Sequence, residues 1–280
     1  MLRYALAFAL LVSLAGCSST IEKGDDAFKG GNYSKALDCY RKALEGGKMK
    51  APELADLHFK MGKTLAKMES LDESVEELKI SIDLKPDNPA VYVAMAENLD
   101  KMGMFDQEIL TLENALILDR ENPHTEGMMG IAFAKLGQYS SALSKFKSAS
   151  RHNPSDPDNF NNIGLVYDST GNADNAIMSW ESAVKVDPAN ETALQNLGAI
   201  YNKTGKYSDA ARSYKRLSEL NPRNTKYLKL LGTACYNSKK YKESYDAFIA
   251  LQKIDPAFPG LADSLLIAKR GMAVLAKRGQ

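Results

Sequence analysis

The 280-residue sequence predicts an all-α fold, an α-solenoid of about seven helical hairpins followed by one C-terminal helix. Three observations predict it. Apolar residues recur at helical spacing, the same pattern returns every thirty-four residues, and glycine and proline stand at fixed places between the helical stretches. In such a repeat each hairpin contacts only its neighbours. We therefore expect one elongated domain.

The repeat is clearest in residues 158–190, where two helical stretches follow each other. Gly164 in the first stretch has no side chain, so it leaves room for Trp180 in the second. Gly171 is expected to end the first helix in a left-handed conformation. Asp174 is expected to accept backbone N–H bonds as the N-cap of the second helix. The stretch therefore predicts a helical hairpin.

The same positions recur at thirty-four-residue steps along the chain. The small residue is Gly62, Ala96, Gly130, Gly164, Gly198 and Gly232. The large residue is Leu78, Leu112, Phe146, Trp180, Tyr214 and Phe248. The helix-ending position is Pro86, Arg120, Pro154, Pro188, Pro222 and Pro256, and proline cannot continue a helix. The expected N-cap is Asp72, Asp106, Ser140, Asp174 and Ser208, and only Lys242 departs from this pattern.

This pattern resembles the tetratricopeptide repeat family in its period and in its small, large and proline positions. The resemblance covers about residues 21–258 and implies a right-handed solenoid. Its units are expected at residues 21–50, 55–88, 89–122, 123–156, 157–190, 191–224 and 225–258. Glu108 and Ser74 replace the small residue that the reference repeat has at Ala176, so looser packing is expected there.

A C-terminal capping helix is expected within residues 259–280. Leu265, Leu266, Ala268 and Met272 supply an apolar face, and we expect a polar back. An open-ended solenoid needs such a helix for solubility.

The N-terminus carries the pattern of a secretory lipoprotein. Residues 1–16 read as a signal peptide, too short to span a bilayer as a helix. Leu14-Ala15-Gly16-Cys17 resembles the lipobox of bacterial lipoproteins, which implies cleavage before Cys17 and acylation of that cysteine with fatty acids such as palmitate. The alternative is an ordinary secretory peptide with an incidental cysteine. Several acyl chains together give stable anchoring.

The residues after Cys17 indicate where the anchor is held. Ser18 stands where an aspartate would be the familiar inner-membrane retention signal, so we expect the periplasmic side of the outer membrane. Residues 17–20 form a short tether that reaches about 10–14 Å. The first repeat is therefore expected close to the lipid headgroups.

Several kinds of chemistry are not indicated. The 36 Lys+Arg and 35 Asp+Glu nearly balance, whereas a nucleic-acid-binding protein needs a basic face. His58, His124 and His152 lack a second ligand at metal-site spacing, and no phosphate-binding glycine loop occurs. We therefore expect no catalytic residue, no metal and no cofactor. Cys39 and Cys235 read as small core residues, with an intermolecular disulfide as the alternative.

The resemblance implies that the first helix of each pair lines a concave groove that binds a protein or an extended peptide. The candidate partner-binding residues are Asn161, Asn162, Asp168, Gln195, Asn196, Asn202, Lys229 and Tyr236. Side-chain amides both donate to and accept from a peptide backbone, so they suit a segment of little sequence preference. They are equally consistent with a solvated polar surface. By position the groove also includes Asp56, Phe59, Lys63, Val93, Glu97, Asp100, Ile131, Asp158, Leu165, Thr192, Lys226 and Thr233.

These patterns predict a non-enzymatic, lipid-anchored scaffold for protein partners. The lipobox, the short tether and the repeat count resemble the pilotins, which are tetratricopeptide lipoproteins of pilus and secretion systems, including the tight-adherence pilus. That resemblance implies a secretin or another pilus or secretion subunit as partner. The alternative is an adaptor that organises peptidoglycan hydrolases or synthases. An enzyme or its regulatory half is the third hypothesis, and no convergent polar cluster in the sequence supports it.

Overall fold

The computed structural model describes residues 19–47 and 49–277, and within these ranges it contains helices and no strand. The all-α fold class is therefore confirmed. The signal peptide, Cys17 and Ser18 lie outside the described residues. Residues 19 and 20, which the sequence assigns to the tether, are helical. None of the described helices combines the length and the apolar character that crossing a membrane requires.

The chain divides into two compact units between His152 and Asn153, where the sequence predicts one domain. The first unit contains helical residues 19–29 and then α2 (Tyr33–Glu45), α3 (Ala51–Lys67), α4 (Leu71–Leu84), α5 (Pro89–Lys101), α6 (Phe105–Leu118), α7 (Pro123–Lys135) and α8 (Tyr139–His152). The second contains α9 (Pro157–Ser169), α10 (Ala173–Val186), α11 (Glu191–Lys203), α12 (Tyr207–Leu220), α13 (Thr225–Asn237), α14 (Tyr241–Ile254) and α15 (Leu261–Lys277).

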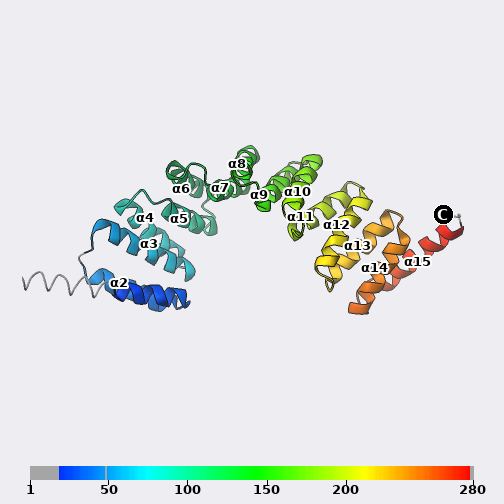
Figure 1. Cartoon of the computed structure of the whole chain (residues 1–280), viewed down its shortest axis with the longest axis horizontal. Helices are drawn as coiled ribbons and strands as arrows, with labels where there is room; N and C mark the ends of the chain where they lie inside the picture. Colours follow the sequence, from blue (N-terminus) through cyan, green and yellow to red (C-terminus); the bar gives the residue numbers. More distant parts are fainter. Residues whose placement is uncertain (1–18, 48, 278–280) are drawn as a thin grey trace, which may run out of the picture. The chain divides into compact units, whose positions relative to one another are not determined.

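Within each unit, helices that follow one another pack against each other as hairpins (Figure 1). Pairs such as α3 with α4 and α9 with α10 are joined by turns of three residues. Inside a unit, the first helix of a hairpin also packs against the hairpin before it, as α5 does on α4 and α11 on α10. The apolar core is consequently a series of local clusters, as expected of a repeat array.

The small residue of each hairpin lies directly under the large one. A Cβ atom built on Gly164 would lie 2.4 Å from Nε1 of Trp180, and one on Gly130 would lie 2.6 Å from Cε1 of Phe146. Comparable contacts of 2.4–2.7 Å join Gly62 to Leu78, Gly198 to Tyr214 and Gly232 to Phe248. The missing side chains therefore set how closely the two helices of these hairpins approach.

The turn inside the hairpin uses a left-handed residue. Gly171 has a φ of 77°, and the next amide, that of Asn172, donates to the carbonyl oxygen of Tyr167 at 2.8 Å. This bond satisfies a carbonyl that the helix end leaves without a partner. Glu69 and Lys239 take the same place in two other hairpins, with φ values of 63° and 64°. Their side chains make this conformation more costly than it is for glycine.

The expected N-cap position is wrong by two residues. α10 begins at Ala173, and its N-cap is Asn172, whose side chain accepts from the amide of Asn175 at 3.3 Å. Asp174 lies in the first turn, where its charge favours the positive end of the helix dipole. The three-residue turn leaves no room for a cap further along. The N-cap residues of α4, α6, α12 and α14, which are Ser70, Met104, Lys206 and Lys240, make no side-chain cap bond, whereas Asn32 caps α2 by accepting from the amide of Lys35 at 3.1 Å.

The last helix, α15, packs by one face and leaves apolar residues on the other. Leu261 and Ala268 are buried, and Gly271 lies against the ring of Tyr241. The outward side exposes the large hydrophobic residues Leu266, Ile267 and Val274, each 43–46% exposed. The expected polar back is therefore wrong, because these residues alternate with Lys269 and Arg270 on the solvent side.

Candidate functional site

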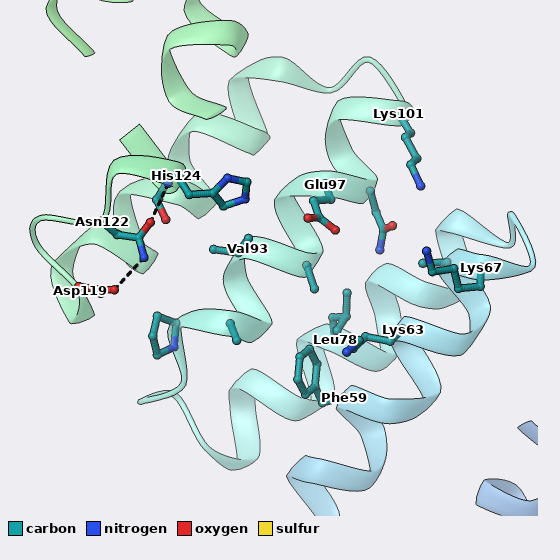
Figure 2. Close-up of a pocket in the computed structure, with 16 residues that line it drawn as sticks. Phe59, Lys63, Lys67, Leu78, Val93, Glu97, Lys101, Asp119, Asn122 and His124 are labelled. Carbon is teal, nitrogen blue, oxygen red and sulfur yellow. Dashed lines mark hydrogen bonds between the residues drawn. The ribbon is translucent and has the colours of Figure 1, made fainter. Parts of the chain in front are cut away.

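A pocket of about 440 Å³ opens between first helices of the first unit. Figure 2 shows Val93 and Glu97 of α5 between the lysines of α3 and His124 of α7. The residues that line it are Phe59, Lys63, Ala66, Lys67, Leu78, Pro89, Ala90, Val93, Ala94, Glu97, Asn98, Lys101, Asp119, Asn122, His124 and Thr125. First helices thus line the pocket, as the family resemblance implied for the groove.

The floor of this pocket is apolar because hairpin packing leaves aliphatic and aromatic surface between the helices. Leu78 is fully buried, and Phe59 and Val93 are partly buried. The ammonium group of Lys63 lies 5.4 Å from the ring centroid of Phe59 and 6.0 Å from that of Phe28. Both distances are within the range of a cation–π interaction. This lysine therefore covers aromatic surface at one edge of the pocket.

Polar groups around the floor are held by bonds within the fold. The Asn122 side chain caps α7 by accepting from the Thr125 amide at 3.0 Å, and it donates to Asp119 at 2.9 Å (Figure 2). Asn98 is buried and donates to Oγ of Ser74 at 2.8 Å. Ser74 in turn donates to the carbonyl oxygen of Gly62 at 2.6 Å. These bonds hold the wall in place, whereas the side chains of Lys67, Glu97, Lys101 and His124 are exposed.

A second pocket of about 220 Å³ lies beside the first, and the two share Glu97 and Lys101. Its remaining lining residues are Asp100 of α5, Glu108 of α6, and Met128 and Ile131 of α7. The sequence marked Glu108 only as a departure from a small residue. A charged residue at a helix-packing position was the signal that could have identified this pocket.

Glu108 is 1% exposed, and its Oε2 atom has no hydrogen-bond partner among the residues that the structure describes. Burial raises the pKa of this carboxyl from its ordinary value of 4.5 to about 7. The negative charge of Asp100 and a hydrogen bond between the Asp100 and Glu108 side chains contribute to this shift in pKa, and the positive charge of Lys135 opposes it. Glu108 is consequently a buried acid that changes charge near neutral pH.

The predicted partner-binding residues lie on first helices of the second unit. Asn161, Asn162 and Asp168 are on α9, Gln195, Asn196 and Asn202 are on α11, and Lys229 and Tyr236 are on α13. Asn162, Gln195 and Asn196 are half-buried, and Nδ2 of Asn196 is a buried donor with no partner in the described part of the chain. These three side chains remain candidates for contacts with a partner.

The prediction for Asn161 needs correction. This residue is 4% exposed, and its amide donates to Oδ1 of Asn190, the residue that caps α11. Its backbone carbonyl oxygen accepts from Nε1 of Trp180 at 3.2 Å. Asn161 therefore supports the packing between two repeats and does not present its amide to the surface.

The other predicted residues have partners inside the unit. Asp168 pairs with Lys203 at 3.4 Å, and Asn202 donates to the hydroxyl of Tyr214 at 3.3 Å. Lys229 lies 5.3 Å from the ring centroid of Phe258, and the rings of Tyr236 and Tyr241 are 5.3 Å apart. Exposed ion pairs contribute little to stability, so the surface at Asp168 stays available to a ligand.

The histidines and cysteines have structural surroundings. Nδ1 of His58 lies 2.5 Å from Glu77, and Nδ1 of His152 lies 2.9 Å from the buried Glu126. No group of three His, Cys, Asp or Glu residues that could hold a metal ion occurs in residues 19–47 and 49–277. Cys39 is half-buried and Cys235 is buried, and both thiols are free.

Comparison with known families identifies the repeats. A sequence model of the tetratricopeptide repeat matches residues 21–89 and 128–193. These repeats are tetratricopeptide repeats. A model described as anaphase-promoting complex, cyclosome, subunit 3 matches residues 169–251. A comparison with curated proteins finds no significant match.

Solved structures, among them tetratricopeptide repeat proteins, share the fold. The C-terminal part of a repeat protein from Cytophaga hutchinsonii is 19% identical, with a TM-score of 0.70, and the match covers 88% of this chain and 99% of that one. The protein pilF from Pseudomonas aeruginosa is 15% identical, with a TM-score of 0.58, over 80% of this chain and 99% of that one. YrrB, described as having an unusual peptide-binding site, is 17% identical, with a TM-score of 0.53. The match covers 70% of this chain and 99% of that one.

Proposed function

We propose that this tetratricopeptide repeat protein is a non-enzymatic, lipid-anchored scaffold that holds an extended segment of a protein partner in the groove of its first unit. The observation that supports this most directly is the open pocket of about 440 Å³ lined by α3, α5 and α7. Its apolar floor accepts side chains of a segment, and its exposed polar rim can fix the direction of the segment.

The first-helix surface of the second unit is a second binding surface in this proposal. Asn162, Gln195 and Asn196 lie on the first helices of adjacent repeats and are only half-buried. Amide side chains there suit a peptide backbone better than a particular side chain. YrrB shows that a protein of this fold can carry a peptide-binding site, as its description states.

The anchor defines the proposed location. Acylation of Cys17 places the protein on the periplasmic side of the outer membrane, and the short segment before the first repeat keeps the scaffold near the headgroups. A partner that is itself in or at that membrane fits this position. We therefore propose a pilotin-like role in assembling a pilus or secretion complex, with a secretin or another subunit of that complex as the partner.

An adaptor for peptidoglycan hydrolases or synthases is the alternative within the same class. It is supported by the same groove and the same anchor, and it differs only in the partner. The resemblance to the pilus and secretion lipoproteins in size, tether and repeat count favours the first role.

Photocrosslinking in living cells separates these proposals. A photoreactive residue is placed at Val93 in the first groove, at Asn196 on the second unit, and at exposed Asn114 on a second helix as the matched control. A parallel strain carries Cys17→Ala. We expect capture of a secretin or pilus subunit from Val93, none from Asn114, and loss of capture without the anchor. Capture of cell-wall enzymes would establish the alternative, and capture from Asn114 alone would overturn the groove proposal.

A further inference from the structure

Glu108 lies at a buried position between packed helices, where a charged side chain is unfavourable. In the other hairpins the corresponding residue is small, as at Ala142, Ala176 and Ala210. Where it is a serine, its hydroxyl is satisfied, since Ser244 donates to the carbonyl oxygen of Gly232 at 2.8 Å. Glu108 instead keeps a buried oxygen with no partner in the described residues. An unpaired buried carboxylate is costly, so this oxygen is an acceptor that a ligand can satisfy.

The charges around this oxygen leave an excess of acid. From α5, Glu97, Asp100 and Lys101 line the same pocket. From α7, Lys135 faces Glu108 but is already engaged, because it is paired with Asp100 and its ammonium lies 5.0 Å from the ring centroid of Phe105. With Glu108 ionised, three carboxylates surround the pocket against two lysines. A further positive group would therefore be favourable there.

The walls of the pocket fit a side chain that combines an apolar stem with a charged end. Met128 and Ile131 supply apolar surface, and Ile131 is 39% exposed at the mouth. A pocket of about 220 Å³ can take the stem of lysine or arginine. No group of three His, Cys, Asp or Glu residues in the described part of the chain could hold a metal ion, and the apolar wall at Met128 and Ile131 favours an organic cation.

We propose that the pocket beside Glu108 binds a lysine or arginine side chain of the partner segment. This inference rests on the proposed function, since it adds a specificity subsite to the groove of the first unit. The two pockets share Glu97 and Lys101, so a segment lying across Phe59 and Val93 can reach Glu108 without leaving the surface. Glu108 then requires one lysine or arginine in the segment, whereas the rest of the groove accepts segments of varied sequence.

The test selects peptides from a random twelve-residue phage library against the full-length chain in detergent, in parallel with Glu108→Gln. Glu113→Gln is the matched control, since Glu113 is an exposed glutamate on the same helix. We expect the wild-type chain and the control to enrich a motif with lysine or arginine at one fixed position. Glu108→Gln should enrich the apolar part of the motif without that basic residue.

A synthetic peptide of the enriched motif then gives the affinity by fluorescence anisotropy. Replacing its basic residue with norleucine should weaken binding to the wild-type chain about tenfold or more and leave binding to Glu108→Gln unchanged. A motif without a basic position, or one kept by Glu108→Gln, would overturn the subsite while leaving the groove proposal intact. Recovery of no peptide at all, or of peptides that bind only the second unit, would overturn both the subsite and the use of the first groove.

Discussion

The side chain of Glu108 couples stability to pH. Its pKa is raised to about 7 in the folded chain, whereas an unfolded chain keeps the ordinary value of 4.5. Between these values the folded state binds more protons than the unfolded state. The wild-type chain therefore loses stability as the pH rises from about 4.5 to about 7, and the loss is complete above 7.

Glu108→Gln removes this penalty because the amide is neutral at every pH. At pH 8 the variant is expected to be more stable than wild type by about 2–3 kcal/mol, and at pH 5 the difference is expected to fall to about 1 kcal/mol or less. Urea unfolding followed by circular dichroism at both pH values measures the difference. Glu113→Gln should change neither value. An equal effect of Glu108→Gln at pH 5 and pH 8 would contradict the assignment of the penalty to this carboxyl.

The packing around Gly164 leaves no room for an added side-chain atom. Gly164→Ala places a methyl group 2.4–2.7 Å from the indole of Trp180, which is held by its bond to the carbonyl oxygen of Asn161. We expect a loss of about 1–3 kcal/mol in the free energy of unfolding, in spite of the better helix propensity of alanine. Thermal unfolding of purified variants measures it.

The chain itself supplies the matched control for this prediction. In α5 and α6 the same positions are Ala96 and Leu112, and both are fully buried. The double variant Gly164→Ala with Trp180→Leu copies that pair, so it should be less destabilised than the sum of the two single variants. Strict additivity of the two losses would show that the methyl group and the indole do not meet.

Among the elements, the hairpin turns show where sequence reasoning succeeds. The left-handed place at Gly171 was predictable, because only glycine adopts a positive φ without strain and the residue stood at the end of a periodic stretch. The cap at Asp174 was wrong because two polar residues, Asn172 and Asp174, compete for one position. The length of the turn decides between them, and a propensity scale does not contain that length.

The same turns contain a site for stabilisation. Lys239 follows α13 with a φ of 64°, in the place that Gly171 takes in its own hairpin. Lys239→Gly should raise the free energy of unfolding by about 1 kcal/mol, because the left-handed conformation no longer meets a Cβ atom. Lys240→Gly is the control, since Lys240 has a φ of −87° and gains nothing. If both variants lowered the melting temperature equally, the strain would not lie at Lys239.

The helix α15 and the pocket of Glu108 show what periodicity alone does not reveal. The apolar spacing predicted a terminal helix, and the buried residues Leu261 and Ala268 lie on the face that packs. The pattern did not show that Leu266 and Ile267 would remain exposed, because both also fit a helical stripe. Likewise, the sequence marked Glu108 as irregular but could not show that its carboxylate lies beside a pocket shared by three helices.

At the scale of the whole molecule, the repeats were predictable because every unit repeats the same small and large contact. The groove residues were less predictable. The position of a residue in a helix predicts which face of the helix it lies on. Asn161 is nevertheless buried, and its side chain donates a hydrogen bond to Asn190, twenty-nine residues away. Such a contact depends on how adjacent hairpins stack, which a single repeat does not encode.

The proposed anchor makes a prediction for the whole chain in its own cell. Cys17→Ala should abolish labelling with a radioactive fatty acid and leave the precursor unprocessed, because the acylated side chain is then missing. Gel electrophoresis and autoradiography of the two strains measure the change. Cys39→Ala should have no effect, and unchanged fatty-acid labelling of Cys17→Ala would rule out a lipid anchor at Cys17.

The proposed binding of a partner segment in the first groove is open to direct measurement. It is tested most directly by the affinity of the purified full-length chain for the segment crosslinked at Val93, measured by fluorescence anisotropy. Val93→Glu places a charge on the apolar floor of the pocket and is expected to weaken binding at least tenfold. Ile117→Glu, at an exposed residue of a second helix, should leave the affinity unchanged. Equal affinity of the wild-type chain and Val93→Glu would show that the segment does not bind in this pocket.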